Sequence, residues 1–176
     1  NKDYIGLWGL VSKATISDLK LECQNISGRS YVGCLVGSSK ESTISGISVT
    51  NTEIHASSQY VGGIIGYASS TSLNNSSYVG KVIGVVDVGG AIGYLDGNTI
   101  SNVKSIANVK GSEHVGGCVG RLYSNCTLES IFHKGDLVNS GNYTGGIVGS
   151  LEYAATILNC THRGNIKGKS EVGGIM

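Results

Sequence analysis

Apolar positions along this chain recur with a period of about 28 residues. The marker of each period is one aromatic or polar residue followed by Val-Gly-Gly, two aliphatic residues and a further Gly. The copies are YVGCLVG at 31–37, YVGGIIG at 60–66, DVGGAIG at 87–93, HVGGCVG at 114–120 and YTGGIVG at 143–149, with a shortened YIGLWG at 4–9 and a partial EVGGIM at 171–176. Successive copies start 27, 29, 27, 27, 29 and 28 residues apart. This regularity predicts a solenoid in which each repeat forms one coil.

The segments between these copies carry apolar columns of their own. Each copy is followed by a Thr- or Ser-aliphatic pair: Thr15-Ile16, Thr43-Ile44, Ser72-Leu73, Thr99-Ile100, Thr127-Leu128 and Thr156-Ile157. Nine or ten residues after that aliphatic residue comes another: Ile26, Ile54, Val82, Val109, Leu137 and Ile166. Because the columns keep their spacing while the residues between them change, we expect like side chains to stack coil on coil in one core. The Thr column is expected to hydrogen-bond along the stack.

The local composition of each unit indicates strands. Short stretches rich in Ile, Val and Thr alternate with Gly, Ser and Asn, a pattern typical of β-structure. No Gly-free run of helix formers is long enough for a helical repeat. We therefore predict an all-β parallel β-helix of about six coils, with 27–29 residues per coil. The paired glycines are expected where the backbone bends sharply or packs closely, and where positive φ is allowed.

We treat residues 1–176 as one β-solenoid segment without an internal domain boundary. Its repeat units are 4–30, 31–59, 60–86, 87–113, 114–142 and 143–170, with a partial unit at 171–176. Because the chain stops partway through a copy, we expect it to be cut from a longer protein. Unpaired coil edges at both ends would then allow end-to-end self-association.

Composition narrows the classes of function. The chain has 28 Gly, no Pro and only 14% charged residues, where about a quarter is typical. Its 13 basic and 12 acidic residues are spread along the sequence and give a net charge of +1. This distribution gives no reason to expect a nucleic-acid partner. The longest apolar stretches, such as 82–86, are too short for membrane insertion.

The five cysteines are few and irregularly spaced. An odd number without a CxxC pair fits neither a disulfide framework nor a zinc site. We interpret most of them as small buried apolar residues. They are Cys23, Cys34, Cys118, Cys126 and Cys160.

These repeats resemble the GLUG motif, a Gly-rich repeat of bacterial extracellular proteins. The resemblance rests on YIGLWG at 4–9, on TISDLKL at 15–21 and on the VGG copies that follow, and it covers nearly the whole chain. It implies a β-solenoid in an exported bacterial protein, either adhesin-like or a non-catalytic region of an IgA-specific metallopeptidase. The first copy departs from the pattern at Leu7-Trp8, so its coil is expected to pack differently. The resemblance supplies no catalytic residues within the repeat.

The column that precedes VGG is the main candidate for binding. A residue next to an inward-facing Val should point outward on a strand. An exposed ladder there could bind sugar rings or a protein partner, because Tyr offers apolar area and a hydroxyl group. The alternative is that Tyr only covers the neighbouring glycines and stiffens the sheet. The proposed ligand-binding residues are Tyr4, Tyr31, Tyr60, His114 and Tyr143, and the same column contains Asp87 and Glu171.

The sequence contains no strong pattern for a catalytic or metal-binding site. None of the four histidines belongs to an HExxH motif, which zinc peptidases need. His133 and His162 are expected on adjacent coils, but with no third ligand evident we predict no metal and no cofactor. Asp87 and His114 are also expected to be neighbours, as an exposed ion pair. The acidic residues occupy mixed positions, so a polysaccharide-degrading β-helix enzyme is the second choice and we predict no catalytic residue.

These patterns together favour a non-enzymatic repeat module of an exported bacterial surface protein, located outside the cell. It would serve as an adhesin-like binding face or a structural stalk, with a host or extracellular protein or glycan as partner. An accessory region of a secreted metallopeptidase is a further alternative.

Overall fold

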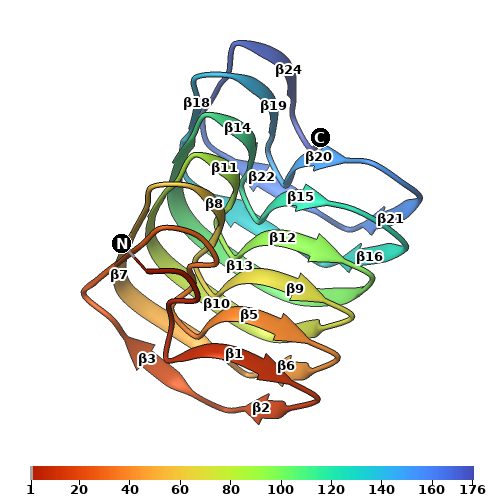
Figure 1. The fold of residues 1–176 in the computed structure, drawn as a ribbon. Coiled ribbons are helices and arrows are strands. Elements are labelled where there is room, and N and C mark those ends of the chain that lie inside the picture. The colour runs from red at the N-terminus through yellow and green to blue at the C-terminus, as the bar shows by residue number, and fades with distance from the viewer. Residues whose placement is uncertain (1) are drawn as a thin grey trace.

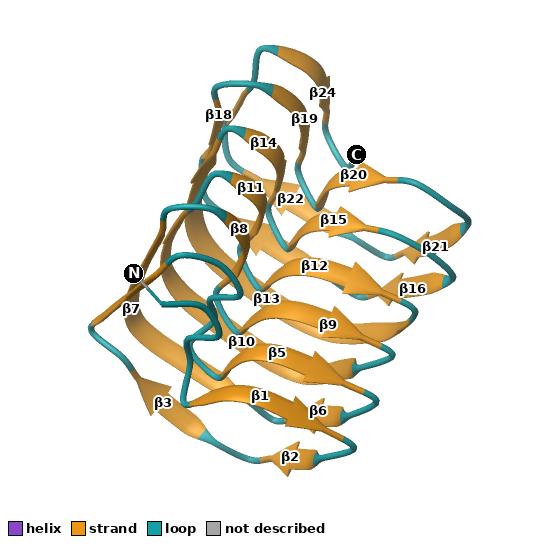
Figure 2. Cartoon of the chain, viewed as in Figure 1, coloured by secondary structure: helices purple, strands orange, loops and turns teal. Residues whose placement is uncertain are grey.

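The chain forms three parallel sheets that run the length of a β-solenoid, as a computed structural model of residues 2–176 shows (Figure 1). The described residues contain strands, turns and loops but no helix (Figure 2), so none of them forms a helix that could cross a membrane. Every strand pairs with its counterpart in the next coil, and there are about six coils. The predicted fold class is confirmed.

Two of the sheets are built from short strands, with no more than one strand from each coil. The front sheet contains β1 (Trp8–Ser12), β5 (Val36–Lys40), β9 (Ile65–Ser69), β12 (Ile92–Asp96), β15 (Val119–Leu122) and β20 (Val148–Leu151). The short sheet contains β8 (Gln59–Gly62), β11 (Val86–Gly89), β14 (Glu113–Gly116), β19 (Asn142–Gly145) and β24 (Ser170–Gly173).

The long sheet closes the back of each coil. Its main path is β2 (Thr15–Ser17), β6 (Thr43–Ser45), β10 (Ser72–Ile83), β13 (Asn98–Gly111), β16 (Cys126–Glu129) and β21 (Ala155–Leu158). The same sheet also contains β3 (Lys20–Glu22), β4 (Asn25–Gly28), β7 (Ser48–Ala56), β17 (Phe132–Lys134), β18 (Leu137–Asn139), β22 (Thr161–Arg163) and β23 (Ile166–Lys167).

The core is a set of aliphatic ladders, as the repeat predicts. Leu73 pairs with Ile44 on one side and with Ile100 on the other, and all three side chains are fully buried. The ladder continues to Leu128, and a second ladder joins Ile54, Val82 and Val109. Stacking buries each aliphatic side chain against its equivalents above and below, which a single coil could not do.

The motif glycines lie where the backbone packs closely, as predicted, but they do not use the positive φ that glycine allows. Positive φ falls on the residue before VGG, as at Tyr31 (57°) and Tyr60 (62°), while the glycines of the motif do not have it. Glycine is needed there for space. A Cβ on Gly116 would collide with the carbonyl oxygen of Val119, and one on Gly117 would collide with the His133 ring. The VGG bend is therefore tight because backbone and side chains from opposite sides of the coil meet at it.

The Thr column does not form the predicted side-chain ladder. Among residues 2–176, hydroxyl hydrogen bonds between coils occur elsewhere, as between Ser39 and Thr71 (3.1 Å) and from the Ile47 N–H to Ser76 (3.1 Å). Thr43 and Thr99 are outward-facing and exposed. Because their side chains point away from the core, water can satisfy these hydroxyls.

The interpretation of the cysteines was wrong in one respect. Cys23 and Cys34 form a disulfide that links the first repeat unit (4–30) to the second (31–59). Cys118 and Cys126 are buried free thiols, and Cys160 is partly buried. The odd number of cysteines does not exclude one disulfide. The spacing of cysteines in the sequence does not show which side chains meet in the fold.

Candidate functional site

The short and front sheets meet along an inward corner that runs parallel to the solenoid axis (Figure 1). The last glycine of each motif lies at its base. A Cβ on Gly66 would lie 2.5 Å from the Val32 nitrogen and 2.7 Å from the Gly37 oxygen, so only Gly lets the two walls approach there. We call this corner the notch.

Two outward-facing columns line the notch. One wall carries the residue before VGG, which is the column identified in the sequence. The opposite wall carries the residue after the last glycine of the motif: Ser38, Tyr67, Tyr94, Arg121 and Ser150, which pair in register along the front sheet.

Tyrosines from both walls fill the N-terminal part of the notch. Tyr67 and Tyr94 stack with centroids 5.0 Å apart and planes at 6°. Tyr60 meets each of them edge-on at 5.4 Å, Tyr31 contacts Tyr60 at 4.9 Å, and Tyr4 stacks on Tyr31 at 4.5 Å. Tyr67 and Tyr94 cover a face of each other, whereas Tyr4 at the end of the cluster is 44% exposed. Burial raises the pKa of the Tyr31, Tyr60, Tyr67 and Tyr94 phenols, which keeps them neutral.

The backbone under this wall is strained. Tyr4, Tyr31, Tyr60 and Tyr143 all adopt left-handed conformations, which cost a residue other than Gly of order 1–3 kcal/mol. Asn or Gly would fit the corner with less strain. Tyrosine at four corners therefore indicates that its side chain matters, through the ring cluster, through binding, or through both.

Farther along, the notch becomes polar. His114 Nδ1 lies 2.7 Å from Asp87 Oδ1, and the side chains of Asp87 and His114 are only 2% and 12% exposed. The prediction of an exposed ion pair was therefore wrong: the corner buries Asp87 beneath its neighbours. On the opposite wall, the Arg121 guanidinium lies 5.8 Å from the centre of the Tyr94 ring and pairs with Glu152. Within residues 2–176, Arg121 Nε is buried without a hydrogen-bond partner.

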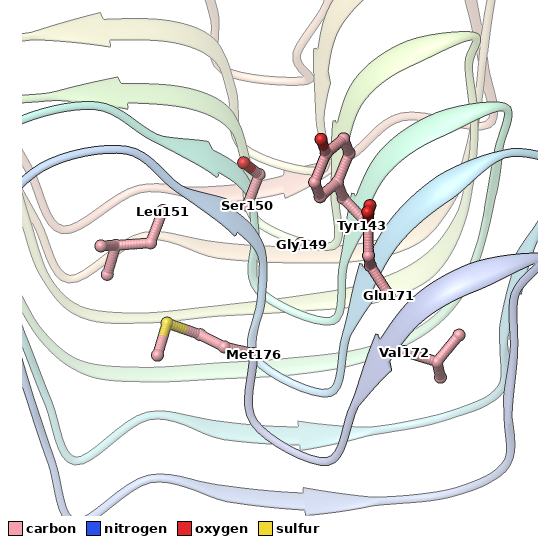
Figure 3. Close-up of a pocket in the computed structure, with 7 residues that line it drawn as sticks. All are labelled: Tyr143, Gly149, Ser150, Leu151, Glu171, Val172 and Met176. Atoms are coloured by element: carbon pink, nitrogen blue, oxygen red, sulfur yellow. The ribbon is translucent and has the colours of Figure 1, made fainter.

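The last part of the notch is open. Ser150 takes the place of the larger Tyr67, Tyr94 and Arg121 of earlier coils, and a pocket of about 430 Å³ lies beside it. The pocket is lined by Tyr143, Gly149, Ser150, Leu151, Glu171, Val172 and Met176. Figure 3 shows Tyr143 and Ser150 projecting from the two walls into the same space. Tyr143 is 38% exposed.

The structure brings the five predicted binding residues into one wall, in two groups. Tyr4, Tyr31 and Tyr60 belong to the ring cluster, while the His114 ring lies 5.1 Å from that of Tyr143. Whether they bind a ligand stays a prediction. Sequence reasoning missed Tyr67, Tyr94 and Arg121. The signal was available, since Tyr follows the last glycine of two successive copies.

Two further histidines form a pair outside the notch. His133 and His162 pair on adjacent coils, as predicted, with Nδ1 atoms 2.8 Å apart and rings stacked at 5.0 Å. His133 is fully buried and its Nε2 donates to the Ala107 carbonyl at 3.0 Å. Among residues 2–176, no three His, Cys, Asp or Glu side chains are grouped to hold a metal.

Comparison with known proteins identifies one similar structure. A crystal structure of a putative immunoglobulin A1 protease from Bacteroides ovatus matches with a TM-score of 0.75 and 20% identity, over 90% of this chain and 53% of that chain. The present chain thus spans about half of that protein. At this identity the likeness shows a shared fold. No protein-family model and no curated protein matches the sequence.

Proposed function

We propose that this chain is a non-enzymatic, ligand-binding module of an exported bacterial surface protein or of the accessory region of a secreted peptidase. The strained tyrosine wall of the notch carries the proposal. The repeat's resemblance to GLUG motifs supports it, as does the fold shared with the putative immunoglobulin A1 protease from Bacteroides ovatus.

The Cys23–Cys34 disulfide supports export, because such bonds persist in oxidising compartments. Alkylation of the denatured protein without reductant should modify three of the five cysteines, and all five after reduction. Mass spectrometry of the intact chain measures the difference. Five modified thiols in protein purified from the native host's exterior would remove this support.

The notch suits a protein partner better than a sugar chain. Sugar rings bind aromatic side chains through exposed ring faces, whereas Tyr67 and Tyr94 cover each other. Ring edges and phenol hydroxyls remain, with the Asp87–His114 pair and Arg121 next to them. Tyrosine and arginine are the residues that most often dominate protein interfaces. We therefore assign the notch to an extracellular protein, with purified immunoglobulin A1 as the first probe.

Replacing Tyr31 and Tyr60 by Asn should weaken binding to this probe by roughly a hundredfold, since two central aromatic anchors are lost. Asn tolerates positive φ, so relief of strain offsets part of the lost ring contacts and the melting temperature should change little. Surface plasmon resonance and thermal unfolding give the two readouts.

The matched control is Tyr153→Asn, which removes a 57% exposed tyrosine outside the notch walls and should leave binding unchanged. A large fall in melting temperature with unaltered binding would assign the tyrosines a purely structural role. If the wild-type protein binds neither immunoglobulin A1 nor a mucin glycoprotein, the proposed binding role loses its support.

A second candidate follows from the buried Asp87–His114 pair. A carboxylate that orients an imidazole is an arrangement that general-base catalysis uses, so a polysaccharide-degrading activity is the alternative. Incubation with a panel of acidic glycans, followed by measurement of new chain ends, tests it. Cleavage by the wild type and none by His114→Gln would favour the enzyme.

A further inference from the structure

Folding gathers basic side chains that are dispersed in the sequence. Alternate residues of β13 face outward, and the register places Phe132 beside Lys104, Val138 beside Lys110 and Lys167 beside Val138. Lys134 and Arg163 are neighbours in the same way. All of these cations are exposed. We call this surface, on the outer side of the long sheet's C-terminal half, the cationic face: Lys104, Lys110, Lys134, Arg163 and Lys167.

The positive charge of this face is not neutralised within the molecule. Among residues 2–176, the ion pairs involve other basic residues and none of these five. The three segments that form the face, 104–110, 132–139 and 161–167, contain a single acid, Asp136. Its carboxylate already accepts hydrogen bonds from the backbone and side chain of Asn165 at 2.9 and 3.1 Å. The whole chain has a net charge of only +1, but this one surface is strongly basic.

Phe132 holds part of this face in place. The Lys104 ammonium lies 5.9 Å and the Arg163 guanidinium 5.7 Å from the centre of its ring. Cation–π contacts restrict both side chains, and both residues are still exposed to solvent. Restricting the side chains in advance lowers the entropic cost of binding an anion.

We infer that the cationic face binds a linear polysaccharide bearing sulfate or carboxylate groups. The strands lie about 4.8 Å apart, so Lys134 and Arg163 are one strand spacing apart and Lys110 and Lys167 are two. Cations at these intervals match a chain with repeated negative charges. Duplex DNA is read by an α-helix or a two-stranded ribbon that enters a groove, whereas this face is part of the surface of a 13-stranded sheet. Single-stranded nucleic acid needs free aromatic faces for its bases, but Phe132 is occupied by cations. This inference concerns a different surface from the notch and does not depend on it.

The test compares two triple variants that lose the same charge. Lys134→Gln, Arg163→Gln and Lys167→Gln alter the face, while Lys2→Gln, Lys13→Gln and Lys20→Gln alter exposed lysines at the other end of the chain. Isothermal titration with dextran sulfate at physiological ionic strength should show a dissociation constant raised about tenfold or more by the first set and less than about twofold by the second. Polygalacturonate replaces dextran sulfate in a parallel titration to separate carboxylate from sulfate recognition, and neutral dextran should not bind.

Equal losses from both triple variants would overturn the inference, because net charge alone would then explain the binding. Tighter binding to duplex DNA or to anionic phosphatidylglycerol vesicles than to either polysaccharide would overturn the ligand class. The wild type supplies an independent measure: the logarithm of its binding constant should fall with the logarithm of salt concentration with a slope of at least about 2 in magnitude. A slope near zero contradicts the inference even if a variant fails to fold.

Discussion

Gly116→Ala is expected to lower the free energy of unfolding by about 4 kcal/mol or more, enough to unfold a marginally stable domain. Ordinary Gly→Ala exchanges have much smaller effects. Here the added methyl group would overlap the Val119 carbonyl oxygen and would also approach the Gly149 nitrogen at 2.7 Å. Both neighbours are backbone atoms, so no rotamer change can relieve the clash. The backbone of the VGG bend would have to open and break pairing with the adjacent coils.

Urea unfolding followed by circular dichroism measures this effect. Gly174→Ala is the matched control. Gly174 occupies the position in the last copy that corresponds to Gly117, and no atom lies within 4 Å of a Cβ added there. Its stability should stay within about 1 kcal/mol of the wild type. A Gly116→Ala protein as stable as the control would show that the bend is looser than described.

Acid should destabilise the solenoid through His133 before most carboxylates titrate. Burial, the largest cause, lowers the pKa of His133 from 6.5 to about 4; the hydrogen bond to Ala107 opposes this, and the neighbouring His162 adds to it. In the unfolded chain the same imidazole takes up its proton near pH 6.5. Between these values the unfolded state binds more protons, so stability falls as the pH falls from 6.5 towards 4. The total loss is about 3 kcal/mol, at 1.4 kcal/mol per unit of pKa.

His133→Ser should reduce this pH dependence, because the equivalent position one coil earlier is Ser105. The variant's overall stability can differ; the relevant quantity is the slope of unfolding free energy between pH 6.5 and 5. Thr99→Ser, at an exposed position without a titratable group, serves as control and should keep the wild-type slope. Equal slopes in the wild type and His133→Ser would contradict the neutral, buried state of His133.

The parts of the structure that depend on the repeat period could be predicted from the sequence. Ile44, Leu73 and Ile100 stack as expected because the solenoid places residues one period apart on top of each other. The pairing of His133 with His162 follows from the same rule. The repeat period gives the register between strands of adjacent coils directly, and this register determines which side chains stack in the core.

Contacts across a coil could not be predicted in this way. The Cys23–Cys34 bridge, the approach of Tyr60 to Tyr67, and the His133 ring beneath Gly117 join positions that belong to different columns. Which columns meet depends on where the chain turns and by how much. The sequence indicated a turn at VGG but not that the left-handed residue is the one before it. The notch and its second wall therefore became visible only in three dimensions.

The corner residue before VGG keeps one backbone conformation while its identity changes from Tyr to Asp, His and Glu along the axis. The side chain at this position can therefore change without a change in the backbone conformation. Tandem duplication or loss of a 27- to 29-residue unit would lengthen or shorten the notch in whole steps and leave the remaining coils undisturbed. Recombination between units could therefore diversify what the molecule recognises without requiring a new core.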